Sequence, residues 1–172
     1  QRVHLHIWHW DTGPGWVTDP REMVKLYADG ARVIKVQLQD DGPVPRSLCD
    51  AYRSCGFKVW GMVRPSNKPL GEGTWGARET AEWIRAERVR LALAGIDCNF
   101  EDEIRAEDIR TSGEWAQNFV KRFRELCPTL PAHLDTYHGS AGGGINLDPY
   151  RTYGFRFAIQ TFWGRDGIWD DP

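Results

Sequence analysis

Short runs of apolar residues recur along the chain and are separated by stretches with an amphipathic pattern. Six of these runs are β-branched or aromatic and contain no strong helix signal, which predicts strands. The strands are expected at 3–11, 31–40, 57–63, 96–103, 131–139 and 155–164. The stretches between them carry helix start and stop signals. Helices are expected from Asp19 and Pro20 to Gly30, from Pro45 to Gly56, over 77–94 with Gly95 in the position after the helix, over 112–126, and near 148–153.

Regular alternation of strands and helices is typical of a parallel sheet with crossover helices. An open doubly wound sheet is one form of this fold, and a closed barrel is the other. The barrel is favoured because each strand has polar residues on one face and because no GxGxxG motif follows the first strand. A full (β/α) TIM-type barrel usually takes about 200–250 residues. The sequence therefore predicts an incomplete α/β barrel of about six strands and five helices, forming a single domain over 1–172 within a longer chain.

Composition narrows the classes of function. The chain has 41% hydrophobic and 27% charged residues and a net charge of −2, so it lacks the basic surface expected of a nucleic-acid-binding protein. No apolar run approaches the roughly 18–20 residues that a membrane helix needs. The four cysteines form no CxxC pair, which predicts reduced, mostly buried thiols in a protein made in a reducing compartment. The glycines at 142–144 lack the helix-initiating context of a phosphate-binding loop, and no cofactor is expected.

The fourth predicted strand, IDCNFEDE (96–103), carries the strongest chemical signal. Strand alternation places Asp97, Asn99, Glu101 and Glu103 on one face. Four polar positions on one face of a buried strand are costly unless they line a solvated cleft. Cleavage of a glycosidic bond uses a protonated carboxylic acid beside the leaving oxygen and a second carboxylate across the bond. Glu101 is the candidate acid, with Asp97, Glu103 or Asp11 as its partner; alternatively, the acidic residues cap the next helix or pair with nearby arginines.

The ends of the other predicted strands are rich in aromatic, amide and charged side chains, as a sugar-binding cleft would require. Nine tryptophans are present, and most lie at or after strand ends, whereas Trp83 and Trp115 lie on predicted helices and are expected in the core. The candidate ligand-binding residues are Trp10, Lys35, Gln37, Arg64, Asn99, Tyr137, His138, Gln160 and Trp163.

A rival interpretation starts from His4 and His6 on the first predicted strand. Metal-dependent hydrolases with barrel folds use a His-x-His pair at this place. Here the pair lies near the start of the strand, and the later strands offer few matching ligands, since the fourth has no Lys and the sixth has no His. Imidazoles on a barrel strand are more often hydrogen-bonded core groups, so no metal site is predicted, and a metal-dependent hydrolase is kept as an alternative.

In order and spacing, these segments resemble the glycoside hydrolase family 25 lysozymes and related glycoside hydrolase-like barrels. The matching segments are VIKV (33–36), VWGMV (59–63), NFEDE (99–103) and the aromatic and Gln residues of the sixth strand. The resemblance implies that Glu101 is the general acid acting on the β-1,4 bond of peptidoglycan. Asn99 stands where the family has an Asp, and Asp11 is a loose counterpart of the Gly-x-Asp segment in the family's first strand.

Three functions therefore remain open: a muramidase-like enzyme, a non-catalytic sugar-binding or structural barrel, and a metal-dependent hydrolase. Barrels of the resembled type occur in bacteriophage lysins and tail-associated proteins. The resemblance thus implies peptidoglycan as the partner, a homo-oligomer or an assembly with other phage proteins, and a location on the virion or release by lysis.

Overall fold

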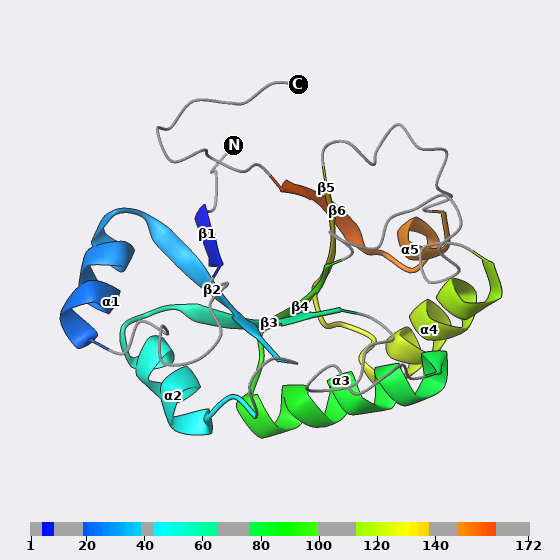
Figure 1. Ribbon diagram of the computed structural model, residues 1–172, viewed down its shortest axis with the longest axis horizontal. Helices are drawn as coiled ribbons and strands as arrows, with labels where there is room; N and C mark the ends of the chain where they lie inside the picture. Colours follow the sequence, from blue (N-terminus) through cyan, green and yellow to red (C-terminus); the bar gives the residue numbers. More distant parts are fainter. Residues whose placement is uncertain are drawn as a thin grey trace.

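The computed structural model describes residues 5–8, 19–38, 43–64, 76–99, 113–137 and 148–160. For residues 5–8, 99, 113, 135–137 and 157–160 it describes the backbone course alone. Within these ranges six strands alternate with five helices (Figure 1). The elements are β1 (Leu5–Trp8), α1 (Pro20–Ala28), β2 (Ala31–Gln37), α2 (Arg46–Ser54), β3 (Lys58–Val63), α3 (Ala77–Leu91), β4 (Gly95–Asn99), α4 (Gly113–Leu126), β5 (Ala132–Tyr137), α5 (Asp148–Thr152) and β6 (Arg156–Gln160).

The six strands form one parallel sheet in the order β1-β2-β3-β4-β5-β6. A doubly wound sheet reverses its strand order at a switch point, whereas here each strand pairs with the next one along the chain. Figure 1 shows the sheet curving, with the helices along its convex side. This is the winding of a TIM-type barrel, and the predicted fold class is confirmed. None of the helices in the described ranges is long and apolar enough to cross a membrane.

The main hydrophobic core lies between the convex side of the sheet and the helices. Alternate residues of β2, β3, β4 and β5 enter it, for example Ile34 and Val36 from β2 and Ile96 from β4. Phe119 and Phe123 of α4 are fully buried in the same core. Burial of one such aromatic side chain stabilises the fold by roughly 2–3 kcal/mol. In β2 to β5, the side chains on the helix-facing side of the strand are therefore used for packing, and those on the other side face the concave side of the sheet.

Local signals position the helices largely as the sequence predicts. Asp19 caps α1, since its carboxylate accepts a 2.8 Å hydrogen bond from the backbone N–H of Arg21, and Pro20 is the first helical residue. Trp83 and Trp115 are partly buried against the core, as expected for helix positions. The four cysteines are free; three are buried and Cys55 is partly exposed.

One helix end differs from the prediction. Gly95 was expected directly after the helix that follows β3, but α3 ends at Leu91 and the left-handed position is taken by Ala92, with φ of 53°. Gly95 is instead the first residue of β4. A Cβ atom at this position would lie 2.3 Å from the indole ring of Trp60 on β3. The glycine is therefore required by a neighbouring strand, which a local helix signal does not reveal.

Candidate functional site

The concave side of the sheet carries the polar residues that are candidates for function. Ile34, Val59 and Ile96 pack toward the helices, so the residues that alternate with them face the opposite way. On β2 these are Lys35 and Gln37, and on β4 they include Asp97. All three are buried, which is unusual for charged and amide side chains. The strand pattern thus produces a polar layer inside the curve of the sheet.

Lys35 and Asp97 form an ion pair between Nζ and Oδ2. Their side chains are 8% and 0% exposed, respectively. β2 and β4 are not neighbours, because β3 runs between them, so the pair spans the concave side of β3. Removing one partner of a buried pair leaves an uncompensated charge and typically costs about 3–5 kcal/mol. The pair therefore links β2 to β4 across β3 and stabilises the sheet at this point.

Gln37 extends this polar layer. Backbone register aligns Gln37 with Met62 and Met62 with Asp97, so the two polar residues lie in one row across the sheet. Within the described part of the chain, the Nε2 atom of Gln37 and the Oδ1 atom of Asp97 are buried and have no hydrogen-bond partner. Buried polar atoms normally have partners. The row therefore keeps one donor and one acceptor available for water or for a polar group of a ligand.

Four more predicted residues lie at or directly after the C-terminal ends of strands, the edge where barrels place their active sites. Asn99 is the last residue of β4, and the backbone register pairs Tyr137 of β5 with Gln160 of β6. Arg64 follows β3 directly and is partly buried. The fold thus brings the ends of β3, β4, β5 and β6 to one edge, two residues beyond the Lys35–Asp97 pair on β4. The remaining predicted site residues lie outside the described residues: Trp10, Asp11, Glu101, Glu103, His138 and Trp163.

The metal hypothesis is not tested by the structure. His4 lies outside the described residues, and only the backbone of His6 is described. Among the described residues, no three His, Cys, Asp or Glu side chains are grouped in a way that could hold a metal ion. His133 on β5 lies in the row of Asp97, and its ring packs at 4.5 Å between centroids against Trp60. In this arrangement His133 has an aromatic neighbour on the concave side.

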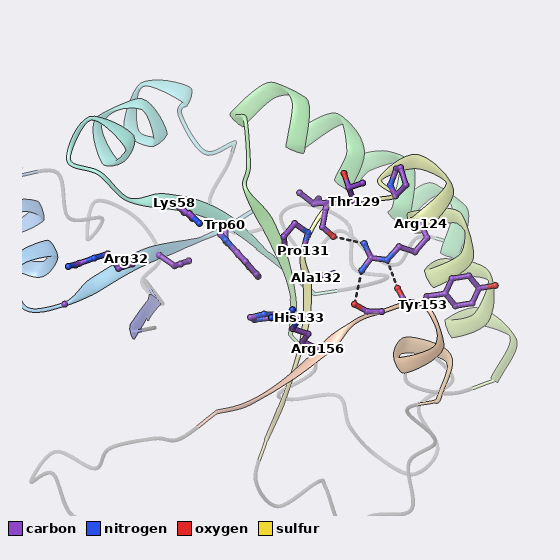
Figure 2. A pocket seen from close by; sticks show the side chains of 15 residues that line it. Arg32, Lys58, Trp60, Arg124, Thr129, Pro131, Ala132, His133, Tyr153 and Arg156 are labelled. Atoms are coloured by element: carbon purple, nitrogen blue, oxygen red, sulfur yellow. Dashed lines mark hydrogen bonds between the residues drawn. The ribbon is translucent and has the colours of Figure 1, made fainter. Parts of the chain in front are cut away.

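Trp60 and the region around it were missed by the sequence-based reasoning, which looked for function at the C-terminal ends of strands. Lys58 and Trp60 alternate with the core residue Val59, a signal that would have placed them on the concave side. Around them the N-terminal ends of β2, β3, β5 and β6 line a hollow of about 1200 Å³ (Figure 2). The molecule thus has two distinct regions of interest, one at each end of the strands.

Several solved structures share this fold. Over 91% of the chain, the catalytic domain of a chitinase from Pyrococcus furiosus aligns with a TM-score of 0.60 and 16% sequence identity, and the match covers 56% of that protein. Pyruvate carboxylase from Rhizobium etli gives a TM-score of 0.60 at 15% identity, covering 91% of this chain and 15% of that one. A protein assigned as a lyase/mutase from Burkholderia cenocepacia gives 0.52 at 13% identity, covering 92% and 60%.

These structures are TIM-barrel proteins of different activities, so the likeness defines the fold class. The chain spans 56%, 15% and 60% of their respective lengths. No protein-family model matches the chain, and no curated protein sequence matches it. The class defined by fold and comparison is therefore a TIM-type α/β barrel whose neighbours include a glycoside hydrolase along with enzymes of other kinds.

Proposed function

We propose that this barrel is a glycoside hydrolase-like protein that acts on a bacterial cell-wall polysaccharide, with Glu101 as the general acid. The observation that carries the proposal is the line of polar residues along β4. Asp97 is fixed in the barrel interior by Lys35, and Asn99 ends the strand at the edge where barrel enzymes act. Strand alternation would make Glu101 the next residue on this line. The chitinase among the structural neighbours is consistent with such a role.

The chemistry would follow the usual scheme for glycosidic bonds. Glu101 would protonate the leaving oxygen, and a second group would stabilise or attack the sugar carbon. The charge of Asp97 is already neutralised by its ion pair with Lys35. We therefore assign the role of the second carboxylate to Glu103 or Asp11. Asn99 would hold the acetamido group of the sugar, and some glycosidases use this substrate group itself as the nucleophile. The sugar rings would contact Trp10, Gln37, Arg64, Tyr137, His138, Gln160 and Trp163.

The second candidate is a barrel that binds the polysaccharide without cleaving it, as a structural component of a phage tail would. Two observations favour it. Asn99 cannot act as a base or nucleophile, and the nearest described carboxylate, Asp97, is fully buried in an ion pair. Both candidates place the ligand at the same edge of the sheet, and they differ only in turnover. Assembly with itself or with other phage proteins belongs to this second candidate.

One experiment separates the two candidates. Purified protein would be incubated with bacterial cell walls, and both released reducing ends and protein sedimenting with the walls would be measured. The variants are Glu101→Gln and, as a control, Glu114→Gln at an exposed position of α4. Release by wild type and Glu114→Gln, but about a hundredfold less by Glu101→Gln, is expected for the enzyme. Equal release by all three would refute Glu101 as the acid.

The same experiment has two further outcomes. Sedimentation with the walls without any release identifies the non-catalytic barrel. If the protein neither releases reducing ends nor sediments with the walls, both candidates are overturned. Elemental analysis of the purified protein tests the metal-dependent alternative that uses His4 and His6. A stoichiometric bound metal, lost on mutation of His4, would favour that alternative over the glycosidase.

A further inference from the structure

The hollow at the N-terminal ends of the strands lies away from the proposed sugar site. Its volume is about 1200 Å³, and its walls come from the beginnings of β2, β3, β5 and β6 and from the segments that precede β5 and β6. Figure 2 shows Lys58 and Trp60 on one side and His133 and Arg156 on the other. Binding sites for small molecules are commonly concave regions of about 300–1000 Å³. The hollow is therefore large enough to hold a small organic molecule.

The charged side chains that line the hollow all have the same sign. Arg32, Lys58, Arg124 and Arg156 contribute to its wall, and no Asp or Glu is among its described lining residues. The whole chain has a net charge of −2, so this local excess of positive charge is not a general property of the protein. An anion entering the hollow would meet an attractive potential.

Two of the four cations are already used for structure. Arg124 donates hydrogen bonds to the carbonyl oxygens of Leu130 and Tyr153, both at 2.6 Å, as Figure 2 shows. Arg32 donates to the carbonyl oxygens of Tyr27 and Ala31, at 2.6 and 2.8 Å. The carbonyls of Tyr27 and Tyr153 lie at the C-terminal ends of α1 and α5, where partial negative charge accumulates. These two arginines therefore need no ligand to explain them.

The other two cations, Lys58 and Arg156, have no such structural role among the described residues. Lys58 is the first residue of β3 and Arg156 is the first residue of β6, and both are exposed. No ion pair or hydrogen bond engages either side chain within the described part of the chain. Alternation along their strands places both on the concave side, in line with Trp60 and His133. Two cations thus lie at the rim of the hollow without an anionic partner.

The floor between these cations is apolar and aromatic. Val33 lies in register with Lys58, and Trp60 is two residues further along β3. The indole of Trp60 crosses Gly95 and meets the ring of His133. Hydrophobic walls with a few placed polar groups are typical of small-molecule sites.

We propose that this hollow binds an organic anion, that is, a phosphate or carboxylate group attached to an apolar or ring-shaped body. The body lies against Val33 and Trp60, and the anionic group lies near Lys58 or Arg156. The site is at the opposite end of the strands from the proposed sugar cleft. It is therefore a second site, and its occupancy does not depend on Glu101.

Isothermal titration calorimetry with four small probes tests the proposal. Phenyl phosphate and benzoate carry both a ring and a negative charge, and they separate a phosphate ligand from a carboxylate ligand. Inorganic phosphate lacks the ring, and benzyl alcohol lacks the charge. At least one of the first two probes is expected to bind with 1:1 stoichiometry, and the last two are expected to bind at least tenfold more weakly. If inorganic phosphate bound as tightly as the ring-bearing anions, the proposal that the hollow recognises the ring would be overturned.

Charge-reversal variants locate the binding site. Lys58→Glu, Arg156→Glu or both are expected to weaken binding by about fivefold or more, because an exposed ion pair worth up to about that factor is replaced by repulsion. Lys121→Glu changes the same charge at an exposed position of α4 and is expected to leave binding unchanged. Circular dichroism verifies the fold of each variant, and Lys58→Gln with Arg156→Gln replaces any that fails to fold. Weakening by Lys121→Glu to the same extent, or the absence of binding by either ring-bearing anion, refutes the proposal.

A failure here is distinguishable from a failure of the proposed function. Glu101→Gln is expected to bind the ring-bearing anion as tightly as wild type, whatever its activity on cell walls. Likewise, Lys58→Glu and Arg156→Glu are expected to keep the wild-type behaviour toward cell walls. Loss of anion binding in Glu101→Gln would place the ligand at the other end of the strands and overturn the assignment of the hollow.

Discussion

The ammonium group of Lys35 on β2 and the carboxylate of Asp97 on β4 pair across the concave side of β3, with both side chains almost fully removed from solvent. Removal of either partner is expected to cost about 3–5 kcal/mol in the free energy of unfolding, because the remaining charge stays buried. Lys35→Met and Asp97→Leu together are expected to recover most of this loss, since two apolar groups of similar size then fill the space.

Chemical denaturation of the two single variants and the double variant measures this effect. The double variant must be more stable than each single variant by at least about 2 kcal/mol. Additive losses in the double variant would mean that the two side chains act separately and that the ion pair is unimportant for the fold.

Gly95 and Trp60 form a second relationship that can be tested by mutation. Gly95→Ala places a Cβ atom 2.3 Å from the Trp60 ring, which must then move. Overpacking of this kind is expected to cost about 1–3 kcal/mol. The same change in a Trp60→Leu background is expected to cost much less, because the ring is absent. An equal cost in both backgrounds, measured by thermal unfolding, would show that the clash is not the reason for the glycine.

Replacement of Ala92 by glycine is expected to stabilise the protein. It ends α3 in the left-handed conformation with φ of 53°, which is unfavourable for a residue with a Cβ atom. Ala92→Gly is therefore expected to raise the free energy of unfolding by about 0.5–1 kcal/mol, as measured by urea denaturation. Ala86→Gly, in the middle of the same helix, is the matched control and is expected to lower it by a similar amount. A loss at both positions would contradict the backbone argument.

Tyr52 is fully buried, and its hydroxyl has no hydrogen-bond partner among the described residues. Tyr52→Phe is expected to stabilise the protein by about 1 kcal/mol at neutral pH, because it removes an unpaired buried polar group and keeps the ring contact with Phe57. Burial also raises the pKa of Tyr52 from 10.0 to about 12.

The raised pKa of Tyr52 gives the variant a further signature in alkaline solution. Between pH 10 and 12 the unfolded chain releases the phenol proton while the folded chain retains it, so unfolding becomes easier as the pH rises. The stability advantage of Tyr52→Phe is therefore expected to grow over this interval, as followed by denaturation at several pH values. A constant difference would indicate that the hydroxyl titrates alike in both states.

The cysteines are expected to react with thiol reagents at very different rates. Cys49 is fully buried, and burial raises the pKa of its thiol to about 11, so little thiolate forms at neutral pH. Cys98 and Cys127 are also buried, whereas Cys55 is partly exposed. Native protein treated with a maleimide is expected to gain one label quickly, and peptide mapping is expected to place it on Cys55. Fast labelling that persists in Cys55→Ser would contradict this order.

The fold was predictable because its signals are local. Each strand carries its own apolar residues, and Asp19 with Pro20 begins α1 through contacts within one helical turn. Alternation along β4 likewise predicted that Asp97 faces away from the helices. The partner of Asp97 was not predictable, because Lys35 reaches it across an intervening strand and that geometry depends on the curvature of the sheet. Gly95 was misassigned for the same reason, since its requirement comes from Trp60 on another strand.

The candidate site shows the same limit. Sequence reasoning identified β4 and the C-terminal ends of the strands, but it gave no attention to the opposite ends. Lys58 and Arg156, the two cations there that have no partner among the described residues, are separated by almost one hundred positions in the sequence. The curvature of the sheet brings β3 and β6 to the walls of one hollow.

The sequential order of the strands has a consequence for how the protein is made. In the described sheet every strand pairs with a strand that is its neighbour along the chain, so no pairing waits for a distant segment. Parallel pairing across a crossover helix forms more slowly than local hairpin contacts, but here each pairing needs only the next strand along the chain. During synthesis, each new strand and helix can therefore dock on the edge left by the preceding unit as soon as it leaves the ribosome. Assembly of this barrel would proceed in the direction of translation, one unit at a time.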